Sequence, residues 1–137
     1  MCLVAWNWKP QSDTPLLLIG NRDEFYARPA QPLHWWPSGR ILAGKDLQAG
    51  GTWLGVSRSG RLAILTNFRD LNQMLINARS RGELVTRFLQ DDMGCEDFLR
   101  QLVPTVADYN HFNLLLFDGK RLYGFESRRA TPFAIAP

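Results

Sequence analysis

Short apolar segments separated by turn residues occupy both ends of the chain, and they limit the folds available to it. Residues 2–8 (CLVAWNW), 15–20 (PLLLIG), 40–46, 52–56 (TWLGV), 62–67 (LAILTN), 112–117 (FNLLLF) and 121–125 (RLYGF) are the expected strands. Between residues 67 and 112 the apolar spacing is instead helical, with one stripe in residues 84–89 and another in residues 98–103. Strands, then two helices, then strands predict an α+β fold with mostly antiparallel sheets.

The bulk composition narrows the class of protein. With 137 residues, 45% of them apolar, the chain suits a single domain around one core. No apolar run approaches the roughly 20 residues of a membrane-spanning helix, and no signal-peptide pattern opens the chain, which favours a cytoplasmic protein without a membrane span. The net charge is +3, and the basic residues are dispersed among 13 acidic ones, so we expect no nucleic-acid partner.

Cys2 is the first candidate for chemistry. Initiator Met is normally removed before a small residue, which would leave Cys2 with both a thiol and a free α-amine. The thiolate is the nucleophilic form, and an α-amine with a pKa of about 8 can act as a built-in general base. N-terminal-nucleophile (Ntn) hydrolases split amide bonds with this pairing. The alternative is a small residue that merely opens a buried strand.

A polar segment, Asn21-Arg22-Asp23-Glu24, follows the second apolar segment. If residues 2–8 and 15–20 pair as a hairpin, opposed residues sum to about 23, and Cys2 lies across from Asn21 or Arg22. A guanidinium beside the thiol would favour the thiolate, and a carboxylate beside the α-amine would orient it. The alternative is a solvated charge cluster that ends a strand.

Two further segments carry candidate site residues. Gly50-Gly51-Thr52 permits a positive φ and a close backbone approach, so its N–H groups can face an anion or an oxyanion. Asn67 ends an apolar strand, where its amide would donate to a developing oxyanion or simply cap the strand end. His34 and His111 lack metal-binding spacings, and Cys95 is expected to start a helix rather than bind a metal. Ser80 and Glu83 match a capping box that would begin the first helix.

The motifs taken together resemble a known family. Residues 19–29 (IGNRDEFYARP) resemble the signature of the NRDE family, also called the transport-and-Golgi-organisation family. Met1-Cys2, residues 50–56 (GGTWLGV), 65–67 (LTN), 81–84 (RGEL) and Asn113 stand in that family's usual order. Members of the family are about twice as long, so the resemblance implies that residues 1–137 are the N-terminal portion of a longer single domain.

The resemblance also implies a fold and a site. It implies an αββα sandwich of the Ntn-hydrolase type, incomplete here, with unpartnered apolar sheet faces that promote association into an oligomer. In similar hydrolases a Cys nucleophile is accompanied by an Arg, an Asp and oxyanion-supporting Asn residues. The residues that match are Cys2, Arg22, Asp23 and Asn67, the spacing of Arg22 and Asp23 being only approximately that of the hydrolases. We expect Asn21, Glu24, Gly51 and Thr52 to contact a ligand.

The sequence leaves two main functions open, beside a third in which the chain is an interaction domain with a vestigial site. One is a Cys2-dependent amide hydrolase or acyltransferase that needs no cofactor and acts on a small-molecule amide. The other is a binding and trafficking protein for haem or an acyl lipid, since the family has been linked to haem trafficking, lipid metabolism, secretion and Golgi organisation. A thiol-reactive acyl probe and a haem titration distinguish them.

Overall fold

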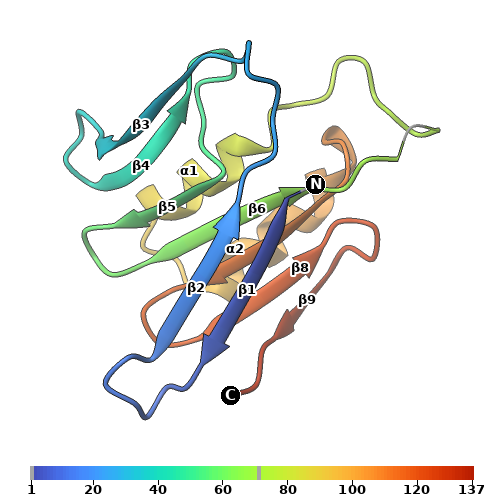
Figure 1. The fold of residues 1–137 in the computed structure, drawn as a ribbon. Coiled ribbons are helices and arrows are strands. Elements are labelled where there is room, and N and C mark those ends of the chain that lie inside the picture. The colour runs from blue at the N-terminus through green and yellow to red at the C-terminus, as the bar shows by residue number, and fades with distance from the viewer. Residues whose placement is uncertain (1, 71) are drawn as a thin grey trace.

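The computed structural model describes residues 2–70 and 72–137 and contains two antiparallel sheets of unequal size. A two-stranded sheet is formed by β1 (Leu3–Trp8) and β2 (Leu16–Asn21), and a seven-stranded sheet has its strands in chain order (Figure 1). The α+β class and the antiparallel pairing predicted from the sequence are confirmed. The seven strands are β3 (Ala30–Trp35), β4 (Ile41–Asp46), β5 (Leu54–Ser57), β6 (Leu62–Asn67), β7 (Phe112–Phe117), β8 (Leu122–Glu126) and β9 (Thr131–Ala134).

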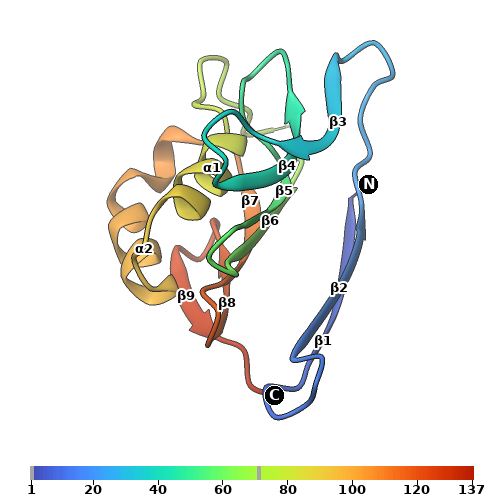
Figure 2. The same ribbon diagram turned by 90° about the vertical axis from the view of Figure 1, so that its left-hand side faces the viewer.

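Helices cover one face of the larger sheet, and the β1–β2 hairpin stacks on the other face (Figure 2). The helices α1 (Gly82–Gln90) and α2 (Cys95–Leu102) and a 3₁₀ helix (Val103–Asp108) are inserted between β6 and β7. Both predicted helical stripes face the sheet, because apolar residues three and four apart lie on one side of a helix. The buried residues of the stripes are Leu84, Val85, Phe88 and Leu89 of α1 and Phe98, Leu99 and Leu102 of α2.

Tight turns set the register of the strand pairs. Gly60 (φ +82°) lies between β5 and β6 and Gly119 (φ +93°) between β7 and β8, as the turn-like residues there predict. The Pro-rich segment after Arg28, which is not among the strands expected from the sequence, contains strand β3. It pairs with β4 and forms one edge of the larger sheet.

The predicted capping box at the start of α1 is wrong. The helix begins at Gly82, and no side chain caps its first turn. Glu83 instead accepts a hydrogen bond from the Tyr109 hydroxyl and pairs with Arg79 at 2.5 Å. Burial raises the pKa of Tyr109 to about 12, and the bond to Glu83 adds to the effect. The distant Tyr109 and the nearby Arg79 therefore take the carboxylate that a cap would have used.

The apolar faces are covered unevenly. Ile64 and Leu116 are fully buried, so the expectation that the strands of the larger sheet lack covering partners is wrong for these positions. The outer face of the hairpin does remain open, with Leu3, Leu17 and Ile19 exposed by 56% or more. Among the described residues no helix combines the length and the apolar character needed to cross a bilayer.

Candidate functional site

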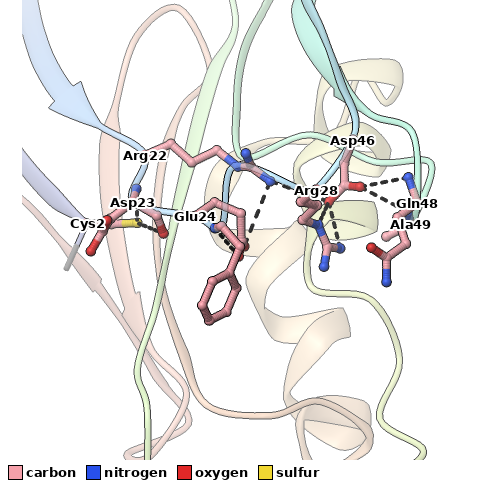
Figure 3. Close-up of polar contacts among 9 residues, drawn as sticks. Cys2, Arg22, Asp23, Glu24, Arg28, Asp46, Gln48 and Ala49 are labelled. Carbon is pink, nitrogen blue, oxygen red and sulfur yellow. Dashed lines mark hydrogen bonds and ion pairs between the residues drawn. The ribbon is translucent and has the colours of Figure 1, made fainter.

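The hairpin brings Cys2 beside the segment that follows β2. Leu3 pairs with Asn21, and the Asn21 Oδ1 atom accepts a hydrogen bond from the Leu3 N–H at 3.1 Å. One step further, the Asp23 N–H lies 3.3 Å from the Cys2 Sγ atom (Figure 3). Opposed residues thus sum to 24 (Leu3 and Asn21), against the expected value of about 23. The juxtaposition follows the predicted register, and the N–H fixes the direction of the partly exposed sulfur.

Arg22 is directed away from the thiol. Its guanidinium extends towards Glu24 and Asp46, with Nη2 at 3.9 Å from Glu24 Oε2 and 3.7 Å from Asp46 Oδ2 (Figure 3). The expectation of a guanidinium beside the Cys2 sulfur is therefore corrected. The backbone of Asp23, and not the Arg22 side chain, contacts the sulfur: its N–H donates to Sγ at 3.3 Å, and the thiol donates to its carbonyl oxygen at 4.0 Å.

Asp46 joins the segment after β2 to the end of β4. Its Oδ2 atom accepts hydrogen bonds from Arg28 Nε and pairs with Arg28 Nη2, both at 2.8 Å. Its Oδ1 atom accepts from the N–H groups of Gln48 and Ala49. Burial acts to raise the pKa of Asp46, but the bonds from Arg28, Ala49 and Gln48 outweigh it and hold that pKa below its usual value. An ionised carboxylate thus positions Arg28.

A cleft of about 350 Å³ lies beside this network, and we call it the cationic cleft. Five of the eight predicted site residues line it, contributed by the segment after β2, the β4–β5 connection and the end of β6: Arg22, Glu24, Gly51, Thr52 and Asn67. Its charged lining comprises the basic side chains of Arg22, Arg28, Lys45, Arg79 and Arg81 and the carboxylates of Glu24 and Asp46.

The paired glycines form one wall of the cationic cleft. Gly50 has a φ of +81°, as the sequence predicts for such a turn. A Cβ atom on Gly51 would lie 2.6 Å from the Gly82 carbonyl carbon, so the backbone approaches the start of α1 too closely for any side chain. The Thr52 hydroxyl donates to the Leu54 carbonyl oxygen at 3.1 Å, and Thr52 is buried. This turn therefore fixes where α1 begins relative to the cleft.

Arg81 is a cleft residue that the sequence analysis did not single out. Its Nη1 atom donates to the His111 carbonyl oxygen at 2.9 Å. Burial lowers the pKa of Arg81, the nearby cations Arg69 and Arg28 lower it further, and the Glu24 carboxylate opposes them. The signal for Arg81 in the sequence is the 81–84 motif. The same segment also matches a helix cap, which gives the arginine no role of its own.

Cys2 opens onto a second, mostly apolar hollow of about 320 Å³ between the hairpin and the larger sheet, here called the apolar groove. Thr66 and Asn113, which pair across β6 and β7, give the groove a polar patch, and Asn113 Nδ2 donates to Thr66 Oγ1 at 3.3 Å. Asn67 lines the cationic cleft, whereas Asn113 lines the groove that Cys2 also lines. The apolar lining includes Val4, Trp6, Ile64, Leu115, Phe133 and Ile135.

The remaining candidates lie apart from these hollows. Cys95 is fully buried and is the first residue of α2, as predicted, and burial raises the pKa of its thiol. His34 Nδ1 lies 2.8 Å from the Pro32 carbonyl oxygen, and His111 Nδ1 lies 3.4 Å from Ser127 Oγ. Across residues 2–70 and 72–137, no three His, Cys, Asp or Glu side chains gather as a metal site.

Comparisons with known proteins place the chain in a family. The model of the family described as "Transport and Golgi organisation 2" matches residues 1–135. The cattle (Bos taurus) protein named "Transport and Golgi organization protein 2 homolog" is 41% identical over 128 residues, and the human protein of the same name is 40% identical over 126. Each alignment covers 86% of this chain but 45% of the relative, so the chain spans about half the length of these proteins. The chain belongs to the Transport and Golgi organisation 2 family.

Proposed function

We propose that this chain carries the nucleophile of an Ntn-type amide hydrolase or acyltransferase, with Cys2 as the attacking residue. The observation that supports the proposal best is the position of the Cys2 sulfur. It is partly exposed, it is oriented by the Asp23 N–H at 3.3 Å, and it borders an apolar groove large enough for part of a small ligand. The stacking of the hairpin on the larger sheet supports an Ntn-type arrangement of two facing sheets.

The proposed reaction has two steps. After removal of Met1, the free α-amine of Cys2 accepts the thiol proton, and Sγ attacks the amide carbon. The carbon–nitrogen bond then breaks, the amine leaves with that proton, and a thioester remains on Cys2. Water, or a second amine in acyl transfer, then displaces the sulfur and releases the acyl group. Asn113 lines the same groove as Cys2 and is the proposed oxyanion donor, whereas Asn67, the donor predicted from the sequence, lines the cationic cleft.

The apolar groove also favours a second candidate, a binding and trafficking protein for an acyl lipid or haem. Apolar side chains line most of it, and binding needs no reactive sulfur. The names of the relatives, which refer to transport and Golgi organisation, suit a trafficking role. Replacing Cys2 distinguishes the two candidates, because chemistry requires the thiol and apolar binding does not.

Labelling with an activated acyl ester tests the hydrolase proposal. We expect stoichiometric acylation of Cys2 in protein whose mass shows that Met1 has been removed. The Cys95→Ala variant is the matched control, since it lacks the buried thiol and should acylate like the unchanged protein. Acylation that maps elsewhere, or an N-terminus that retains Met1, would contradict the proposal.

The Cys2→Ala variant tests it further. We expect loss of all amide hydrolysis, because no other described thiol borders the groove. Stability should fall by only about 1 kcal/mol, the middle of the usual range for a single substitution. Circular dichroism and urea unfolding measure the fold. Hydrolysis that survives the change would rule out Cys2 as nucleophile, and gross unfolding would show that Cys2 is structural.

A further inference from the structure

We propose that the substrate of the Cys2 centre is an amide that also carries a negatively charged group, and that the cationic cleft binds this group through Arg81. The inference rests on the proposed function and adds the class of substrate. An N-acyl amino acid has the required chemistry, with an apolar acyl part, an amide bond and a carboxylate. The lining of the cleft has an excess of positive charge.

The cleft has five basic side chains and two acidic ones, and neither acid neutralises Arg81. Asp46 already accepts bonds from Arg28 and from two backbone N–H groups. Glu24 accepts from the Phe25 N–H through Oε1 and faces Arg22 through Oε2. Within the described residues, no carboxylate comes within 4.0 Å of the Arg81 guanidinium as an ion-pair partner.

Arg79 offers a contrast on the same wall of the cleft. It pairs with Glu83 at 2.5 Å and with Asp108 at 3.8 Å, so its charge is balanced inside the protein. Arg81 donates one hydrogen bond to a neutral carbonyl, although a guanidinium has five N–H donors in a planar fork. That fork matches a carboxylate, which it binds through two parallel hydrogen bonds. Arg81 is thus a cleft cation with bonding capacity to spare; Lys45 also has no carboxylate partner among the described residues, but its ammonium lies over the Trp36 ring.

The surroundings make the uncompensated charge of Arg81 costly. The guanidinium is partly withdrawn from water, and Arg69 and Arg28 repel it, while the Glu24 carboxylate offsets only part of these effects. Helix α1 begins at Gly82, which also lines the cleft, and the N-terminal end of a helix attracts negative charge. An anion bound in the cleft would offset the repulsion between these arginines. It would contact both the Arg81 guanidinium and the N-terminal end of α1. The volume of about 350 Å³ is within the range of small-ligand sites.

The cleft adjoins the groove that contains Cys2. Arg22 lines the cleft, and the next residue, Asp23, contacts the Cys2 sulfur through its N–H. Thr66 lines the groove and the next residue, Asn67, lines the cleft. Figure 3 shows the Arg22 side chain running from the Cys2 side towards Arg28 and Asp46. Since Thr66 and Asn67 are successive strand residues on opposite faces of the sheet, a ligand with its apolar group beside Cys2 and its charged group near Arg81 passes around the end of β6.

Binding to a protein that cannot turn the ligand over tests this inference. We would titrate the Cys2→Ala protein calorimetrically with N-hexanoylglycine and with its neutral analogue, N-hexanoylglycinamide. We expect the carboxylate to bind at least about tenfold more tightly, as for a charged hydrogen-bonded pair. Adding Arg81→Gln should remove most of that preference. Adding Arg100→Gln, an exposed arginine of α2 far from the cleft lining, should preserve it.

Equal affinity for the two ligands, or binding of neither, would overturn the inference, and this comparison needs no arginine variant to fold. A preference that survives Arg81→Gln would overturn the role of Arg81. Turnover by the protein with Cys2 intact separates the two proposals. Hydrolysis without preference for the carboxylate would refute the charged substrate alone, whereas selective binding without hydrolysis would support the cleft and refute the amide chemistry.

Discussion

Gly51 provides the sharpest structural test, because its absent side chain lets the β4–β5 connection contact the start of α1. In a Gly51→Ala variant the new Cβ atom would lie 2.6 Å from the Gly82 carbonyl carbon, 2.7 Å from its oxygen and 3.0 Å from the Glu83 nitrogen. All three are backbone atoms, so no side-chain rotation relieves the overlap. The helix start and the turn must separate, which widens the cationic cleft.

The expected cost follows from two opposing effects. Ordinary contact begins at 3.4 Å, so the closest pair must move apart by roughly 0.8 Å. Overpacking of this kind costs about 1–3 kcal/mol. At a position without positive φ, Ala also restricts the unfolded chain, and this effect stabilises the folded protein by about 0.4–1 kcal/mol. The net loss should be about 1–2 kcal/mol, which corresponds to a fall in Tm of about 4–8 °C for a chain of this size.

Urea unfolding followed by tryptophan fluorescence measures the change. Gly94→Ala is the matched control, because Gly94 has a φ of −62° and its added Cβ would meet its nearest atom at an ordinary 3.7 Å. We expect this control to unfold close to the unchanged protein. If Gly51→Ala is as stable as Gly94→Ala, the close approach of the turn to α1 does not constrain the fold, and the reasoning is refuted.

Two further predictions concern polar side chains that hydrogen-bond to the backbone. Arg61 is only 4% exposed and donates to the Phe88 and Met93 carbonyl oxygens. Arg61→Met should therefore lower the free energy of unfolding in urea by about 2–4 kcal/mol, and the surface change Arg100→Gln should lower it by under about 1 kcal/mol. Equal effects of the two substitutions would contradict this prediction. Burial acts to raise the pKa of Asp118, but bonds from the Arg121, Cys95 and Lys120 N–H groups hold it below 3.8. The ionised carboxylate therefore stabilises the fold above pH 3.8, and this contribution is lost as pH falls through the lower folded pKa. Asp118→Asn should lower stability at pH 7 and flatten its acid dependence, and an unchanged acid limb would refute this.

Most of the strands and both α-helices of this protein could be predicted from its sequence. Apolar runs bounded by turn residues predicted β1, β2 and β4 to β8, and the helical spacing predicted both helices, since burial on one face of a helix imposes that spacing. Strand β9 was missed, and the residues of β3 fitted either a long loop or a short strand. The turn between residues 8 and 15 placed Cys2 near Asn21 because an antiparallel hairpin leaves little freedom of register. The glycine pair predicted a close backbone approach, and the structure shows that the backbone of Gly82 is the one that approaches Gly51.

Contacts between elements depended on the tertiary structure. Glu83 looked like a local cap, yet the fold brings Tyr109 to it from 26 residues away. Asn67 and Cys2 were grouped in one site, but the strand and the hairpin present them to adjoining hollows. Arg81 gained its significance from the positions of Arg69, Arg28 and Glu24 around it. Spacing along the chain determines which residues share a face, whereas only packing decides which charges meet and which remain unbalanced.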